Sequence, residues 1–202
     1  MSIDVPEDIA TELVDAGRWL ASRGWVPATS GNFSRRIDAD TIAITASGVD
    51  KGELRGGDVR GISLREPLPH GVSAETPIHV MLYQESADIG AVLHTHSLAA
   101  TVVSMAHETS IPLSKYEMLK GIRGFKSHDA TYKLAVFPNA QDMGVLAKEV
   151  RAHLKSEPQT FAFALAGHGL YAWGASIREA RRHIEAVEFL LSCELERGRY
   201  RP

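Results

Sequence analysis

Apolar positions along the chain follow two alternating patterns, one helical and one typical of short strands. Apolar residues three or four positions apart predict helices over residues 8–23, 76–86, 98–106, 143–154 and 176–191. Thr76 suits the N-cap of the second helix, and Pro77 its first helical position. Ser176 and Glu179 form a capping box, so the last helix has the most clearly defined start.

Short runs rich in β-branched and aromatic residues lie between the predicted helices, bounded by glycine, serine and aspartate turns. Strands are predicted within residues 27–37 and 41–48, and at 59–64, 91–95, 133–137, 160–167 and 170–173. The chain contains no fixed-period repeat, low-complexity stretch or linker. This mixture of elements predicts a single α/β layer structure.

Composition and charge narrow the class of protein. Hydrophobic residues at 44% and charged residues at 23% are typical of a globular protein, and 202 residues suffice for one core. A net charge of −3 offers no basic surface for a nucleic acid backbone, so we expect no such partner. No apolar run reaches the roughly 20 residues that span a bilayer. The acidic start and the single cysteine, Cys193, favour a soluble cytoplasmic protein.

Three histidines carry the clearest chemical signal. His94 and His96 are two positions apart at the end of an apolar strand, so their side chains project from the same face and can chelate one ion. His168 lies between two glycines in a turn joining apolar strands, where the backbone is free to bring a third imidazole close. Three neutral nitrogens suit zinc or a similar divalent ion, and they leave a coordination position open for a substrate.

A coincidental histidine pair, with one ring in solvent and the other hydrogen-bonded, is the alternative explanation. The apolar flanks weigh against it, because two imidazoles buried there without a ligand would lose their hydration. The other histidines occupy predicted loops or helix surfaces and are assigned structural roles, with His79 the least secure: His70, His79, His107, His128, His153 and His183.

Five motifs in order resemble the class II aldolase and adducin-head superfamily: SGNFS, ITASG, SAETPIH, VLHTHS and GHGLYAWG. The segments EMLKG, GHGLYAWG and ARRHIEAVEFLLSCELE are most similar to its methylthioribulose-1-phosphate dehydratase family, which acts in methionine salvage. The resemblance implies one domain over residues 1–202, a single-domain α/β/α layer fold with a central, mainly antiparallel sheet. It also implies a homo-oligomer, a homotetramer by analogy.

The same resemblance assigns roles to individual residues. It implies that His94, His96 and His168 hold one Zn²⁺ per subunit and that Glu117 is the catalytic acid/base, with a pKa raised by partial burial. Glu75 is a second catalytic candidate, at the place where aldolases of this superfamily carry their acid/base. The candidate substrate phosphate contacts are Ser30, Gly31, Asn32, Ser47, Gly48, Lys51 and Ser73.

Two alternatives to the dehydratase remain open. With Glu75 as its base, the chain would be a sugar-phosphate aldolase or epimerase, although Ala74 replaces one of the two serines that precede this glutamate in aldolases. A binding module like the adducin head would share the fold without catalysis or metal. Isolated glycine and serine turns are also more often ordinary hairpin turns than phosphate loops.

Overall fold

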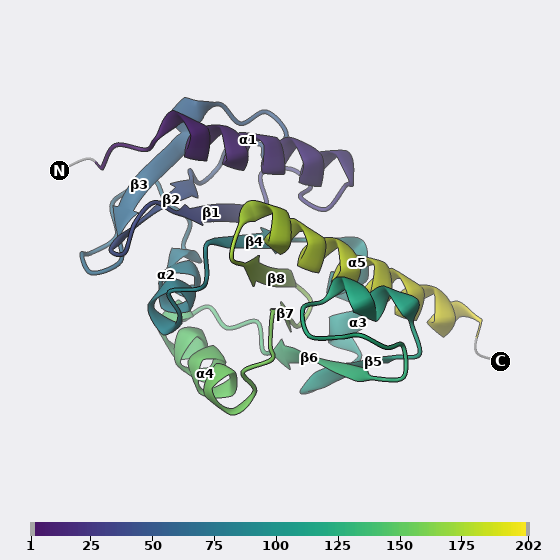
Figure 1. Cartoon of the computed structure of the whole chain (residues 1–202). Helices are drawn as coiled ribbons and strands as arrows, with labels where there is room; N and C mark the ends of the chain where they lie inside the picture. The colour runs from purple at the N-terminus through teal and green to yellow at the C-terminus, as the bar shows by residue number, and fades with distance from the viewer. Residues whose placement is uncertain (1–2, 201–202) are drawn as a thin grey trace.

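The computed structural model describes residues 3–200 as one central sheet with helices on both faces (Figure 1). The strands are β1 (Asn32–Arg36), β2 (Thr41–Thr45), β3 (Val59–Ser63), β4 (Ala91–Thr95), β5 (Ser110–Ser114), β6 (Thr131–Phe137), β7 (Ala162–Leu165) and β8 (Gly169–Gly174). The helices are α1 (Glu7–Ser22), α2 (Thr76–Glu85), α3 (Leu98–Met105), α4 (Met143–Ser156) and α5 (Ile177–Arg199), with short 3-10 turns η1 (Gly56–Asp58) and η2 (Glu117–Gly121).

The sheet has the strand order β3-β2-β1-β4-β8-β7-β6-β5. Neighbouring strands are antiparallel except β6 and β7, which run parallel and are joined by the crossover helix α4. The prediction of an α/β/α fold with a mainly antiparallel sheet is therefore confirmed. Within the part of the chain that the structure describes, no helix combines the length and the apolar character needed to cross a membrane.

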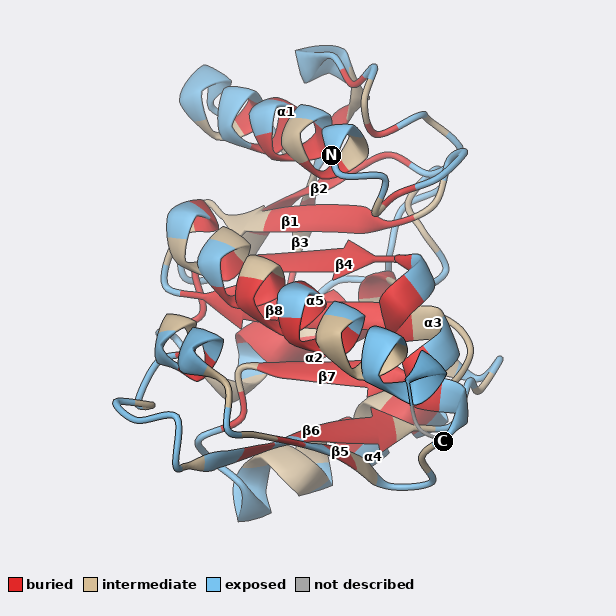
Figure 2. Ribbon diagram, turned by 90° about the vertical axis from the view of Figure 1, so that its right-hand side faces the viewer, coloured by how far each residue is buried: buried red, intermediate tan, exposed pale blue. Residues whose placement is uncertain are grey.

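The two faces of the sheet are covered by different helices. Helices α1, α3 and α5 pack on one face and α2 and α4 on the other, each with its own apolar core (Figure 2). Strand β4 lies near the middle of the sheet, between β1 and β8, and all of its residues are buried. The end of β4 is therefore a position where polar side chains are partly shielded from water and rigidly held.

The predicted helices are all present, but α5 continues to Arg199, well beyond the predicted end at residue 191. Glu75 is the N-cap of α2 and Thr76 its first residue, one position earlier than predicted. The Ser176 hydroxyl accepts a hydrogen bond from the Glu179 amide as a capping box requires. The Glu179 carboxylate, however, accepts from the Ala175 amide and pairs with Arg123, so the second half of the box is displaced.

Strand β5 is the element that the sequence pattern did not indicate. It contains Pro112, which has no amide hydrogen and interrupts a strand pattern. The strand lies at the edge of the sheet next to β6, and an edge strand tolerates a proline. Ile111 and Leu113 on either side of the proline are buried and hold the strand against the core.

Candidate metal and active site

The pairing of β4 with its two neighbours sets the position of the predicted chelate. His94 lies opposite Asn32 of β1 and opposite Tyr171 of β8. The Tyr171 ring stacks on the His94 imidazole, with centroids 3.9 Å apart and planes at 14°. His96 follows the end of the strand, and its amide donates to the Trp25 carbonyl at 2.8 Å. Backbone pairing and ring stacking thus orient the His94 imidazole, and the contact with Trp25 holds the backbone of His96.

The turn that carries His168 packs directly on the end of β4. Gly167 has a positive φ of 66°, which a glycine adopts without strain. A Cβ at Gly169 would lie 1.9 Å from the Thr95 carbonyl oxygen, so a side chain there would displace the turn. The two glycines therefore allow His168 to approach His94, as the sequence predicted.

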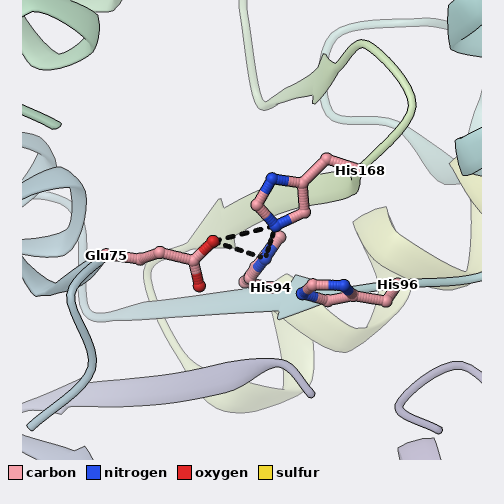
Figure 3. Close-up of side chains that lie close together, drawn as sticks. All are labelled: Glu75, His94, His96 and His168. Atoms are coloured by element: carbon pink, nitrogen blue, oxygen red, sulfur yellow. Dashed lines mark hydrogen bonds and ion pairs between the residues drawn. The ribbon is translucent and has the colours of Figure 1, made fainter. Parts of the chain in front are cut away.

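Four side chains converge at this point, and Figure 3 shows them facing one another. Glu75, His94, His96 and His168 each place one potential ligand atom so that all four atoms lie within 4.8 Å of one another. The Nε2 atom of His168 lies 3.3 Å from Nε2 of His94 and 2.8 Å from Oε1 of Glu75. The structure thus joins the three predicted metal ligands to Glu75, which enters from the start of α2.

Hydrogen bonds behind the rings determine which nitrogens carry protons. The Nδ1 atom of His94 lies 3.1 Å from the Leu170 carbonyl oxygen, which only accepts, so Nδ1 is the donor. The Nδ1 atom of His168 likewise donates to the Asn139 side-chain oxygen at 3.0 Å. In their neutral forms both rings therefore present the lone pair of Nε2 to the cluster. Such outer contacts are typical of histidines that bind metal ions.

The donor set fits a divalent cation. Neutral His94 and His168 would bring two nitrogen lone pairs within 3.3 Å of each other, with a carboxylate oxygen of Glu75 beside them. These atoms repel one another unless a positive charge lies among them. Three imidazoles and a carboxylate are also ligands that zinc and similar ions accept.

The charges at the site agree with this interpretation. Burial lowers the pKa of His96 to about 3, helped by the neighbouring His94 and His168, so His96 is a neutral ligand at neutral pH. Burial by itself would raise the pKa of Glu75, but its contacts with His168 and His94 outweigh burial and lower the pKa well below its usual range. Glu75 is therefore a carboxylate, with positive charge favoured next to it.

The predicted phosphate loops lie beside Glu75. Gly31 and Gly48 both have φ of 75°, as tight turns require. The Ser73 hydroxyl accepts from the Glu75 amide at 3.2 Å and from the Asn32 side chain at 3.3 Å. The Ser47 amide donates to the carbonyl of Gly71, just before this segment. The loops around residues 30, 47 and 73 thus meet in one region.

Two of the predicted phosphate contacts have partners within the protein. Asn32 donates to Oε2 of Glu75 at 2.6 Å, so its amide is engaged with the carboxylate. Lys51 is only 1% exposed, and its ammonium donates to the carbonyls of Thr29 at 3.0 Å and Val49 at 2.6 Å. Burial lowers the pKa of Lys51, partly offset by Asp50. Lys51 therefore links the two glycine loops and adds positive charge behind them.

Glu117 is not one of the converging groups. It lies in η2 on the surface, with its side chain 68% exposed and paired with Lys120 at 2.5 Å and with His128 at 3.1 Å. The hydrogen bond from Lys120 holds its pKa below the usual range. The single chain therefore shows an exposed, ionised carboxylate, contrary to the partly buried group with a raised pKa that we expected, and the catalytic role of Glu117 stays a prediction.

The structure also reveals polar residues that sequence reasoning assigned to surfaces. His79 and His183 are fully buried. The ring of His183 contacts the Trp173 carbonyl at 2.6 Å and accepts from the Arg123 amide, which is a structural role. His79 belongs to a buried network that ends at Glu75.

Comparison with known proteins identifies the family. Residues 11–195 match the sequence profile of the class II aldolase and adducin N-terminal domain. The chain belongs to this family. The class II aldolase fold is also found in solved structures: an L-fuculose-1-phosphate aldolase from Thermus thermophilus matches with a TM-score of 0.78 at 24% identity, over 96% of both chains. The putative aldolase/epimerase/decarboxylase YgbL from Escherichia coli matches with a TM-score of 0.82 at 21% identity, over 96% of this chain and 91% of that one.

Other relatives of the chain are more similar to it in sequence than these solved structures, and they are named as dehydratases rather than aldolases. A protein of Sorangium cellulosum named methylthioribulose-1-phosphate dehydratase is 47% identical over 94% of this chain and 92% of its own. A Bradyrhizobium protein with the same name is 46% identical over 89% of this chain and 87% of its own. The family resemblance predicted from the sequence motifs is therefore confirmed.

Proposed function

We propose that the chain is a hydro-lyase that converts 5-methylthioribulose 1-phosphate to 2,3-diketo-5-methylthiopentyl 1-phosphate, and that it acts in cytoplasmic methionine salvage with one zinc ion per subunit. The similarity to dehydratases along nearly the whole chain supports the substrate. The observation that carries the chemistry is the convergence of three imidazoles and a carboxylate on one point.

The reaction removes the C3 proton and the C4 hydroxyl of the substrate as one molecule of water. Abstraction of the C3 proton places negative charge on the C2 ketone oxygen, and loss of the hydroxyl from C4 gives an enol that rearranges to the diketone. When bound by His94, His96 and His168, the metal ion supplies Lewis-acid stabilisation of this charge. Three histidine ligands would leave coordination positions open for substrate oxygens.

The chain itself supplies the groups that move protons and hold the phosphate. Glu75 is the carboxylate that lies at the cluster, with a side chain 15% exposed and thus open to a substrate. The Ser30 hydroxyl is buried and has no hydrogen-bond partner among residues 3–200, and its donor is free for a phosphate oxygen. Amides of the Gly31 and Gly48 loops and the charge of Lys51 complete a suitable anion site.

Glu117 keeps its predicted acid/base role only in an oligomer. In a single chain it lies on the surface in η2, outside the cluster that contains Glu75. The homotetramer predicted from the family would allow η2 of one copy to complete the cluster of another. In this proposal Glu75 and Glu117 belong to the same site but to different subunits.

Product analysis tests the proposed reaction. The zinc-loaded protein is incubated with 5-methylthioribulose 1-phosphate, and the products are separated and identified by mass spectrometry and NMR. We expect a single phosphorylated product lighter by one water, and no such product with Glu75→Gln. Two smaller carbonyl fragments would instead identify an aldolase, and an unchanged mass with altered NMR signals an epimerase.

An aldolase remains the second candidate because the structure places Glu75, the carboxylate that aldolases use, 2.8 Å from His168. A non-catalytic binding module would not need this donor set. Elemental analysis of the purified protein separates it from both enzymes, since the dehydratase and the aldolase are expected to contain about one metal ion per chain.

A further inference from the structure

A buried row of polar side chains runs from the metal cluster into the protein between β1 and α2. Asn32 and Ser34 are two residues apart on β1, and His79 and Tyr83 are four residues apart on α2, so each pair shares one face of its element. All four side chains are at most 2% exposed. Together with Glu75 they form one unbroken chain of hydrogen bonds.

The links in this row are short and well defined. Asn32 Nδ2 lies 2.6 Å from Oε2 of Glu75, and Asn32 Oδ1 lies 2.5 Å from Nε2 of His79. Beyond the imidazole, Nδ1 of His79 lies 2.6 Å from the Ser34 hydroxyl. That hydroxyl lies 2.9 Å from the hydroxyl of Tyr83.

The direction of the first two hydrogen bonds follows from the carboxylate. Ionised Glu75 can only accept, so the Asn32 amide must turn its NH₂ group toward the carboxylate. The Asn32 oxygen then faces His79, and because a carbonyl oxygen only accepts, the proton of the neutral His79 ring must be on Nε2.

The remaining hydrogen bonds are fixed by the charge of the ring. Burial lowers the pKa of His79 to about 3, with a further contribution from His94, so the ring is neutral and Nδ1 has no proton. Nδ1 therefore accepts from the Ser34 hydroxyl, whose oxygen accepts in turn from Tyr83. Burial raises the pKa of Tyr83, which keeps its proton for this contact. Every donor in the row has one acceptor.

We propose that His79 is a positioning residue for Glu75, acting through the orientation of the Asn32 amide. If that amide were reversed, its oxygen would face the Glu75 carboxylate and its NH₂ group would face the Nε2 proton of His79. The Nε2 proton of His79 therefore favours the amide orientation in which Asn32 donates a hydrogen bond to Oε2 of Glu75. Oε1 is then held toward His94 and His168. As far as it concerns turnover, the inference rests on the proposed function.

The tautomer of His79 can be measured without substrate or metal. Long-range ¹H–¹⁵N NMR of the metal-free protein distinguishes a protonated Nε2 from a protonated Nδ1, and the His79→Gln variant identifies the signals of this ring. We expect a neutral ring with the proton on Nε2 throughout the neutral pH range. A proton on Nδ1, or a charged ring, would overturn the inference.

Two matched variants test the consequence for Glu75. Gln at position 79 places an amide NH₂ near the position of Nε2 and can still donate to Asn32, whereas Asn reaches only to the position of Nδ1. Both are neutral amides in the same buried space. We expect His79→Gln to retain kcat within about threefold of wild type and His79→Asn to lose about 10- to 100-fold, with a much smaller change in KM.

Zinc titration of the two variants separates this inference from the proposed reaction. We expect His79→Asn to bind zinc about tenfold more weakly than His79→Gln, because the Glu75 oxygen is no longer held at the cluster. An inactive wild-type protein would contradict the proposed reaction. The zinc titration and the NMR measurement need no substrate and would still test the role of His79. Equal zinc affinity and equal melting temperature in both variants would show that His79 does not position Glu75.

Discussion

The Nε2 atoms of His94 and His168 lie 3.3 Å apart although the residues are 74 positions apart in the chain. One ring is fixed by the central strand β4 and the other by the glycine turn before β8. Because β4 is paired with β8 along its whole length, the contact follows from the structure of the sheet. Folding thus brings these two side chains together, and little further ordering of them is needed when a ligand binds.

Removal of one imidazole is expected to abolish tight metal binding. His168→Ala deletes a ligand atom at the point of convergence, and we expect at least a tenfold loss of zinc affinity by titration. At a zinc concentration 100 times the wild-type dissociation constant, wild-type protein should gain about 2.7 kcal/mol of stability, and the variant at most about 1.4 kcal/mol. His70→Ala, at an exposed histidine outside the cluster, is the control. Unchanged zinc affinity in His168→Ala would contradict the assignment.

Mixed oligomers can show whether Glu75 and Glu117 act from different subunits. We expect Glu75→Gln and Glu117→Gln each to lower kcat by about 10²- to 10⁴-fold, since each removes a group that moves a proton. Coexpression of the two variants should restore about a quarter of the wild-type activity, because random assembly recreates some sites with both carboxylates.

The exposed Glu157→Gln variant is the control for a lost surface charge. Full activity in Glu117→Gln would remove Glu117 from the mechanism. Two inactive variants that never complement each other would place both carboxylates in one chain.

Two glycines with the same backbone conformation are expected to differ in their tolerance of a methyl group. Gly31 and Gly48 both have φ of 75°, but a Cβ at Gly31 would lie 2.7 Å from the His94 carbonyl oxygen, whereas a Cβ at Gly48 would meet no neighbouring atom of residues 3–200 within 4 Å. We expect Gly48→Ala to cost about 1 to 2 kcal/mol of unfolding free energy from strain alone. Gly31→Ala should cost more and also weaken zinc binding. Equal destabilisation by urea unfolding would contradict the close approach.

The buried carboxylate of Glu188 predicts a specific pH dependence of stability. Burial raises its pKa to about 7, against the hydrogen bonds donated by Ser97 and Thr95, whereas in the unfolded chain the pKa is near 4.5. The folded state therefore binds the extra proton, and this contribution to stability is complete below pH 4.5 and is lost as the pH rises through 7.

Urea unfolding of metal-free protein between pH 5 and 8 tests this. Relative to Glu188→Gln, wild-type protein should lose up to about 3 kcal/mol over this range. Glu157→Gln should follow the wild-type profile. Parallel profiles for wild type and Glu188→Gln would show that Glu188 is ionised in the folded state.

The sequence predicted the parts of the fold and site that depend on local patterns. Helical spacing located the helices, and the strand position of His94 and His96 predicted their shared direction. Strand β5 was hidden by Pro112, because only its place at the edge of the sheet makes that residue acceptable.

The buried polar residues were missed for a related reason. His79 and Glu188 lie on helices, where a polar side chain usually faces water, and only the tertiary packing shows their burial. One signal was available, because Glu188 lies one turn after Ile184 and next to Val187, on the apolar stripe of α5. The position of Glu117 relative to other copies is not contained in any pattern of one chain.

Asn32 of β1 lies opposite His94 of β4, so the geometry of the metal site depends on the correct register of these two strands. A shift of one residue between these strands would turn one of the two side chains to the opposite face of the sheet. The histidine ligands would then be separated from Asn32, which holds the Glu75 carboxylate, and zinc would bind weakly. Metal uptake by a refolding or mutated chain therefore reports whether the middle of the sheet has reached its native arrangement.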